Sequence, residues 1–328
     1  MNRDKAIVPT VVIAYNFPEI EIEQRIIGAT GAEVIHTRRL DTPDALAAAS
    51  RADVLMVTIE PVPAELIDRL DHCKLICRVG TGLDAIDIPA ATRRGIWVTN
   101  VPDYAIDEVS THAIALLLNH ARRLPTLFGL VERGQWWDAK QVGPIRRLRG
   151  QTLGLLGYGR IGQAMAVKAQ GLGLNVLAYD PYLSPEVLAA DGVRSVDLET
   201  MLREADYVSL HAPLTVATRE ILNASTLALM KPTAYIINTA RGALINEAAL
   251  LDAVQSGKIA GAALDVLQKE PVAPDSPLLK EPRILLTPHA AWYSEEANED
   301  VRVKGAEDVV RVLRGERPRT PVNEIERV

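Results

Sequence analysis

The chain has 328 residues and a formal net charge of −6, with 48% hydrophobic and 24% charged residues. This length suits two globular domains, and the composition excludes a disordered or low-complexity protein. The sequence holds no apolar run of the roughly 18 to 20 residues that span a bilayer, and its acidic balance and few aromatic residues argue against a nucleic-acid surface. We therefore expect a cytoplasmic protein that binds neither nucleic acid nor membranes.

The first part of the chain alternates between two kinds of segment. The runs TVVIAY, DVLMVT, KLICRV and GIWVTN predict strands, and the amphipathic stretches between them predict helices. This alternation favours a parallel sheet with crossover helices. Residues 107–123 then predict a long helix with Asp107 as its N-cap. Cys73 and Cys77 lie at the entry to a predicted buried strand, so we interpret both as structural and expect no metal site.

A second alternating series begins at Leu153. It holds six predicted strands, TLGLLG, LNVLAYD, YVSLHAPL, TAYIINTA, IAGAALDV and RILLTPH, which is enough for a nucleotide-binding sheet. A last helix is predicted after Ser294 and ends at Gly315, because glycine is favoured after a helix C-terminus. The predicted fold class is α/β, with two Rossmann-like, doubly wound parallel-sheet domains.

Residues 153–163, LGLLGYGRIGQ, contain the spacing G-x-G-x-x-G between a predicted strand and a predicted helix. Gly157 permits the tight turn, Gly159 lets a pyrophosphate approach the backbone, and Gly162 lets the helix pack closely on the strand. The first N–H groups of the helix, at Arg160 and Ile161, are placed to bind phosphates. The segment therefore predicts a dinucleotide site.

The next strand, LNVLAYD, ends in Asp180. A carboxylate at this position accepts hydrogen bonds from the adenosine ribose hydroxyls and repels a 2′-phosphate. Pro181 and Tyr182 follow it, where an NADP site would favour an arginine. The prediction is therefore NAD, preferred over NADP.

Three later strand ends carry residues suited to reducing a 2-oxo acid. Arg241 lies in NTARG, Glu270 follows Asp265 in DVLQKEP, and His289 lies in TPHAAW. In an open α/β sheet the ligand binds beyond these strand ends. Histidine supplies a proton near neutral pH, a carboxylate orients its ring, and arginine holds a carboxylate. Each residue alone also fits a structural role, but their joint placement favours catalysis.

These segments, with RVGTGLDAIDI, NVP and AYDPY, resemble the D-isomer-specific 2-hydroxyacid dehydrogenase family over nearly the whole chain. The sequence is most similar to the C-terminal-binding-protein branch, in which HAAWYS is a distinctive form. The resemblance implies a catalytic set of Arg241, Glu270 and His289. It implies further cofactor contacts at Thr81, Ala212, Pro213, Thr218, Thr239, Ala240, Asp265, His289 and Ala291, with Asp265 meeting the nicotinamide carboxamide. It implies substrate binding at Val79, Gly80, Thr81, Arg241 and His289.

The resemblance also implies an architecture. Residues 1–102 and 294–328 would form a discontinuous substrate domain and residues 103–293 the NAD domain, with a cleft between them. The long helix would cross over and help form a homodimer. His211 would lie on the cofactor side as a packing or adenine-side residue, whereas His36, His72, His112 and His120 receive no role. Trp136 and Trp137 are expected to pack at a dimer or interdomain surface.

The predicted function is NAD-dependent reduction of a small 2-oxo acid, with His289 as acid/base. Trp292, three residues after His289, offers an indole wall to an apolar substrate side chain, and Asp103 and Tyr104 are further candidate contacts. Asp103 would disfavour an anionic side chain, while glyoxylate and hydroxypyruvate stay open. The alternative is an NADH-sensing, corepressor-like scaffold with little turnover, and the complete catalytic set argues against it. Formate or phosphite oxidation is disfavoured because Glu270 is present.

Overall fold

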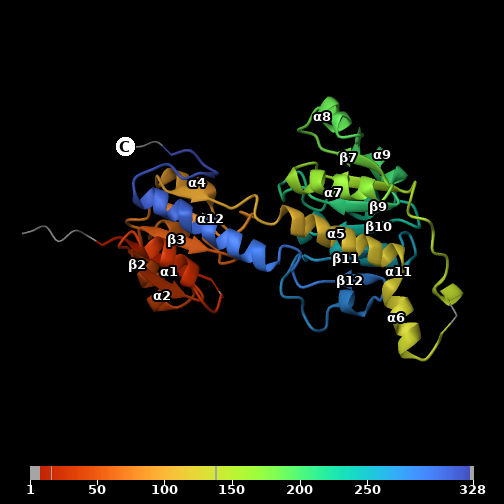
Figure 1. Ribbon diagram of the computed structural model, residues 1–328, viewed down its shortest axis with the longest axis horizontal. Helices are drawn as coiled ribbons and strands as arrows, with labels where there is room; N and C mark the ends of the chain where they lie inside the picture. The colour runs from red at the N-terminus through yellow and green to blue at the C-terminus, as the bar shows by residue number, and fades with distance from the viewer. Residues whose placement is uncertain (1–7, 16, 137–138, 326–328) are drawn as a thin grey trace, which may run out of the picture. The chain divides into compact units, whose positions relative to one another are not determined.

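The computed structural model describes residues 8–15, 17–136 and 139–325 (Figure 1). For residues 139 and 140 it describes the backbone only. The chain divides into two compact units, one of residues 1–104 and 294–328 and one of residues 105–293. Within the described ranges the first unit holds a five-stranded sheet and the second a seven-stranded sheet. Every strand pair in both sheets is parallel, so the predicted α/β fold class is confirmed.

The sheet of the first unit has the order β2-β1-β3-β4-β5. Its strands are β1 (Thr10–Ala14), β2 (Glu33–Thr37), β3 (Val54–Val57), β4 (Leu75–Arg78) and β5 (Trp97–Thr99). One buried cluster joins this sheet to α2 (Pro43–Ser50), α3 (Ala64–Ile67) and α4 (Ile88–Arg93). The opposite cluster joins it to α1 (Glu21–Gly28) and α12 (Glu295–Leu313). Residues far apart in the sequence therefore share one core, and α1 and α12 lie side by side (Figure 1).

The sheet of the second unit has the order β12-β11-β10-β9-β6-β7-β8. Its strands are β6 (Thr152–Leu156), β7 (Asn175–Tyr179), β8 (Arg194–Ser195), β9 (Tyr207–Leu210), β10 (Tyr235–Asn238), β11 (Gly261–Leu264) and β12 (Ile284–Leu286). Its helices are α5 (Ile106–Ala121), α6 (Leu124–Glu132), α7 (Arg160–Gly171), α8 (Pro185–Ala190), α9 (Leu198–Glu204), α10 (Ala224–Leu227) and α11 (Glu247–Gln255). Short 3-10 turns cover Ala139–Val142, Gly242–Leu244 and Pro277–Lys280.

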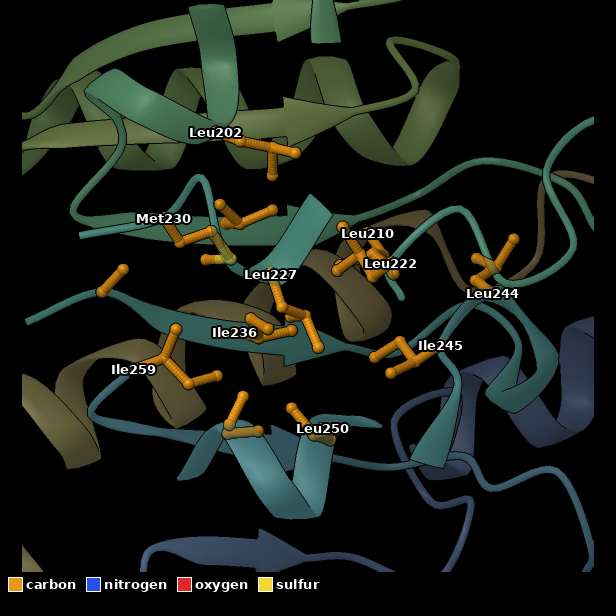
Figure 2. Packing of buried hydrophobic residues seen from close by; sticks show 14 of the residues in the cluster. Leu202, Leu210, Leu222, Leu227, Met230, Ile236, Leu244, Ile245, Leu250 and Ile259 are labelled. Atoms are coloured by element: carbon orange, nitrogen blue, oxygen red, sulfur yellow. The ribbon is translucent and has the colours of Figure 1, made fainter. Parts of the chain in front are cut away.

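Alternate residues of these strands enter two separate cores, as the period of a strand requires. One core packs the sheet against α5 and α7. The other packs it against α9, α10 and α11, and includes Leu202, Leu227 and Leu250 of these helices together with Ile236 of β10 (Figure 2). Because both faces are covered, the strands read as the near-continuous apolar runs seen in the sequence.

Two strands and one helix start differ from the sequence predictions. The strands β2 and β8 were missed because they lie at sheet edges, where EVIHT and RS present exposed and half-buried positions in place of an apolar run. The N-cap predicted at Asp107 is wrong: α5 begins one residue earlier, Ala105 precedes it without a side-chain cap, and Asp107 lies in the first turn. There its carboxylate is 2.6 Å from Lys168 Nζ of α7, so tertiary pairing decided its place.

The long helix also ends earlier than predicted. α5 stops at Ala121, and Arg123 adopts a left-handed φ of 53° before α6 begins. α12 begins as predicted, directly after Ser294, which caps its N-terminus, and it ends at Leu313, two residues before the predicted end at Gly315, whose φ is 78°. Cys73 and Cys77 are buried without a disulfide, and burial raises the pKa of each thiol to about 12. No helix among residues 8–15, 17–136 and 139–325 is long and apolar enough to cross a membrane.

Candidate active site

The turn between β6 and α7 is shaped by its glycines. Gly157 has a φ of 93°, and a Cβ there would lie 2.7 Å from the main-chain nitrogen of Ala212. A Cβ on Gly162 would lie 2.5 Å from the carbonyl oxygen of Gly157, so the close packing predicted for this glycine is present. At Gly159 a Cβ would meet nothing within 4 Å. Gly159 is the N-cap of α7 and provides no side-chain cap, which leaves the first N–H groups of the helix open to an anion.

Asp180 lies directly after β7, beside this turn. Its Oδ2 accepts a hydrogen bond from the Tyr158 N–H at 2.9 Å, and its Oδ1 accepts one from the Tyr182 N–H at 3.0 Å. A carboxylate oxygen offers two acceptor positions. Each oxygen of Asp180 therefore keeps one further acceptor position while the backbone fixes the orientation of the carboxylate.

The strand order reverses between β6 and β9, the position where doubly wound sheets bind nucleotides. Ala212 and Pro213 follow β9, and the loop after them is closed by Thr218, whose hydroxyl donates to the Pro213 carbonyl at 2.7 Å. Thr239 and Ala240 follow β10. The buried Thr239 hydroxyl finds no hydrogen-bond partner among the described residues. Four features therefore fit a dinucleotide: the glycine turn, the open N-terminus of α7, the oriented carboxylate of Asp180 and the available hydroxyl of Thr239.

The predicted catalytic residues come together within the second unit. His289 Nδ1 lies 2.6 Å from Glu270 Oε2, and Glu270 Oε1 accepts the Leu267 N–H at 2.8 Å. Arg241 follows β10, in a turn held by Asn238, which donates to the Arg241 carbonyl at 2.8 Å. A Cβ on the next residue, Gly242, would lie 1.9 Å from the Leu267 carbonyl carbon. The turns that bear Arg241 and Glu270 are therefore in direct contact.

The electrostatics of this group keep Glu270 ionised. Burial, the largest single influence, raises the pKa of Glu270, while hydrogen bonds from His289 and the Leu267 N–H lower it. The charges of His289 and Arg241 lower the pKa of Glu270 further, and its net direction is below the ordinary value. The side chain of His289 is 47% exposed. Its Nδ1 is engaged by Glu270, which leaves Nε2 as the ring nitrogen outside this contact.

The turn after β12 is held by Asp265, at the end of β11. The Asp265 Oδ1 accepts the Thr287 hydroxyl at 2.5 Å and the Ala290 N–H at 2.9 Å, and its Oδ2 accepts the Ala291 N–H at 2.9 Å. His289 between them has a left-handed φ of 55°. Asp265 therefore has a clear role inside the protein, in addition to the nicotinamide contact predicted for it.

Sequence reasoning gave no role to His112, whose Nε2 lies 3.2 Å from Thr287 Oγ1. His112 belongs to α5, and its partner is 175 residues away in the sequence, so no local pattern identifies it. His120, further along the same helix, stacks on Tyr235 with ring centroids 3.6 Å apart. His211 pairs with the Ser209 hydroxyl at 2.9 Å, and burial lowers the pKa of His211 to about 4. A neutral His211 suits the packing role expected for it.

The remaining predicted residues are placed as follows. Trp292 is partly buried, and its ring meets that of Tyr293 edge to face. Val79, Gly80 and Thr81 belong to the first unit, after β4, where the Thr81 hydroxyl donates to the Val101 carbonyl at 3.2 Å. Asp103, expected to disfavour anions, is 3.2 Å from Lys304 Nζ. Trp137 lies outside the described residues.

Fold and site define a dinucleotide-binding α/β protein with an Arg–Glu–His group at its strand ends. The family model for the NAD binding domain of D-isomer specific 2-hydroxyacid dehydrogenases matches residues 114–291. The chain belongs to this family.

Similar proteins carry several activities. The D-3-phosphoglycerate dehydrogenase of Archaeoglobus fulgidus is 42% identical over 262 residues, which cover 80% of this chain and 49% of that protein. The glyoxylate reductase of Thermococcus litoralis is 40% identical over 276 residues, 82% of each chain. The structure of D-lactate dehydrogenase from Aquifex aeolicus, complexed with NAD and lactic acid, has a TM-score of 0.86 and 28% identity over 94% of this chain and 96% of that one. The chain spans about half the length of the phosphoglycerate dehydrogenases it matches.

Proposed function

We propose that the protein is an NAD-dependent D-2-hydroxyacid dehydrogenase that reduces a small 2-oxo acid, with His289 as acid/base. The observation that carries the proposal is the 2.6 Å contact between His289 Nδ1 and Glu270 Oε2, beside Arg241 and at the strand ends of an NAD-binding sheet. A buried, fully satisfied histidine would indicate a structural role, whereas the His289 side chain is 47% exposed. The ring is oriented on one side and accessible on the other, as an acid/base requires.

The cofactor, when bound, supplies the hydride. His289 donates a proton from Nε2 to the carbonyl oxygen of the substrate during reduction and takes it back during oxidation. Glu270 fixes the ring through Nδ1 and stabilises the imidazolium. Arg241 holds the substrate carboxylate and polarises the carbonyl through its planar donors. Val79, Gly80 and Thr81 stay predicted contacts of the substrate carboxylate, and Asp265 stays the predicted partner of the carboxamide.

Asp180 supports a preference for NAD over NADP. Its two oxygens keep acceptor positions for the ribose hydroxyls, and its negative charge opposes a 2′-phosphate. Pro181 and Tyr182, which follow it, bring no compensating positive charge.

The segment HAAWYS, residues 289–294, supports a place in the C-terminal-binding-protein-like branch. We assign Trp292 to the substrate side chain, where an indole favours apolar or thioether groups. Lys304 Nζ lies 3.2 Å from Asp103 and 3.8 Å from Asp300, so two carboxylates face one ammonium group, and this negative balance disfavours a phosphorylated substrate.

A homodimer is the proposed assembly. Phe128 and Val131 on α6 and Trp136 just beyond it are 62%, 52% and 63% exposed. Large apolar side chains gathered on one short segment favour a protein contact. Analytical ultracentrifugation tests this assignment on the wild type and on a variant with both Phe128→Glu and Val131→Glu. The wild type should sediment as a dimer and the variant as a monomer, and the same molecular mass for both would refute the assignment.

The decisive experiment is a turnover assay with a panel of substrates, followed as NADH oxidation for the oxo acids and as NAD reduction for the hydroxy acid. The panel contains glyoxylate, hydroxypyruvate, pyruvate, phenylpyruvate and a thioether oxo acid, with D-3-phosphoglycerate in the oxidative direction. His289→Gln is expected to keep NADH binding and to lower turnover at least about a hundredfold. Turnover that survives this change would exclude His289 as the acid/base. NADH binding by a wild type that turns over no panel member would favour the cofactor-sensing scaffold.

The Trp292→Ala variant tests whether Trp292 contacts the substrate side chain. The variant is expected to lose more efficiency with phenylpyruvate and the thioether oxo acid than with glyoxylate. Equal losses on all three substrates would make Trp292 a structural residue.

A further inference from the structure

His112 is connected to the turn that carries His289 by a continuous chain of hydrogen bonds. Its Nε2 lies 3.2 Å from Thr287 Oγ1, and the Thr287 hydroxyl lies 2.5 Å from Asp265 Oδ1. The Asp265 carboxylate accepts the N–H groups of Ala290 and Ala291, both at 2.9 Å. All these residues belong to the second unit, and the last two follow His289 directly.

The donors and acceptors in this chain have one consistent assignment. An ionised carboxylate only accepts, and a threonine hydroxyl has a single hydrogen. Thr287 gives that hydrogen to Asp265, so Thr287 Oγ1 must accept from His112. His112 therefore carries a proton on Nε2, either as the neutral Nε2–H tautomer or as imidazolium. The Nε2 atom lies 3.8 Å from Asp265 Oδ1. Both forms of His112 maintain the same contact with Thr287.

The turn needs this support because of its backbone. His289 has a φ of 55°, a left-handed conformation that non-glycine residues adopt at a cost and keep only where their surroundings enforce it. The enforcing bonds come from Asp265: its carbonyl accepts the His289 N–H at 2.9 Å, and its carboxylate accepts the next two N–H groups. The Asp265 side chain is 1% exposed, so water does not replace these bonds.

We propose that His112 is a positioning residue for His289, acting through Thr287 and Asp265. By donating to Thr287, it fixes the rotamer in which Thr287 donates to Asp265, and so fixes the carboxylate that holds the turn. α5 supplies a rigid base because it packs on α7 and on the sheet. The kinetic part of this inference rests on the proposed function, in which His289 is the acid/base.

The test compares three variants at constant pH. His112→Leu removes the donor, His112→Gln retains an N–H donor, and His120→Phe is a matched control on the same helix that keeps the stack with Tyr235. We expect His112→Leu to lower kcat about three- to tenfold, the usual worth of one hydrogen bond, with Gln restoring most of it and the control unchanged. A defect that is only structural would not be rescued by a different side chain with the same donor.

Hydrogen–deuterium exchange gives a second readout that needs no turnover. His112→Leu should speed exchange in residues 287–293 and leave α7 unchanged, and His112→Gln should restore the wild-type rate. If His112→Leu unfolds the protein, Thr287→Val breaks the same chain at a nearly isosteric site and should give the same two effects. Unchanged kcat and exchange in His112→Leu, or no rescue by Gln in either readout, would overturn the proposal. A wild type without turnover would refute the proposed function, while exchange would still decide the role of His112.

Discussion

Replacing Glu270 with Gln tests the central contact of the site. Glu270 uses both carboxylate oxygens, one for the Leu267 N–H at 2.8 Å and one for His289 Nδ1 at 2.6 Å. A glutamine has one acceptor oxygen. If that oxygen keeps the Leu267 N–H, the amide N–H₂ group faces His289, and Nδ1 must become an acceptor. The imidazolium then loses its partner.

The size of this loss follows from the exposure of the pair. A hydrogen bond to a charged group contributes about 1.5 to 3 kcal/mol. The side chains of His289 and Glu270 are 47% and 36% exposed, so solvent screening reduces the value to about 1 to 2 kcal/mol. Reduction needs a protonated His289, and such a loss lowers its rate near neutral pH by roughly 5- to 30-fold. The pH–rate profile of reduction should therefore differ from that of the wild type.

The assay is the pH–rate profile of NADH oxidation between pH 5 and 9, with the best substrate of the panel. Glu247→Gln is the matched control, because Glu247 also accepts a main-chain N–H, that of Gln268, at 2.6 Å and in the same region of the unit. It should leave the profile unchanged. A Glu270→Gln profile that overlays the wild-type curve would refute the role of Glu270 in orienting and charging His289.

Other changes test the cofactor site and the acid stability. Asp180→Ala should raise the efficiency with NADPH relative to NADH about tenfold; an unchanged ratio removes Asp180 from cofactor choice. Gly162→Ala should cost about 1 to 3 kcal/mol of unfolding free energy because its Cβ would meet backbone, whereas Gly159→Ala should weaken NADH binding without this loss; equal thermal shifts would contradict the predicted contrast. Burial, then the charge of Arg123, lowers the pKa of His120 to about 4. As the pH falls, His120 therefore takes up its proton in the unfolded chain before it does so in the folded protein. The contribution of neutral His120 to the free energy of unfolding is complete above about pH 6.5 and is lost as the pH falls towards 4. Between pH 7 and 5 the wild type should lose on the order of 2 kcal/mol more unfolding free energy than His120→Phe, measured by urea unfolding. Equal losses in the two proteins would refute the lowered pKa of His120.

Much of the fold follows from sequence patterns with a local cause. Buried parallel strands produce apolar runs, and helix caps such as Ser294 and Gly315 act within one turn of the chain, so both kinds of element were predicted. The edge strands β2 and β8 were missed because a strand at the edge of a sheet is partly exposed to solvent, so its sequence need not be an apolar run. Asp107 was misassigned because its partner, Lys168, belongs to another helix.

The sequence by itself determined the nucleotide turn, Asp180 and the three polar strand ends. The physical reason is that parallel strands deliver their carboxyl ends to one edge, so spacing along the chain predicts neighbours in space. Tertiary structure alone decided which atoms meet: that His289 faces Glu270 through Nδ1, that Asp265 holds the turn, and that His112 supports it from α5. These contacts depend on how a helix and a strand separated by much of the chain pack together, which no local pattern of residues encodes.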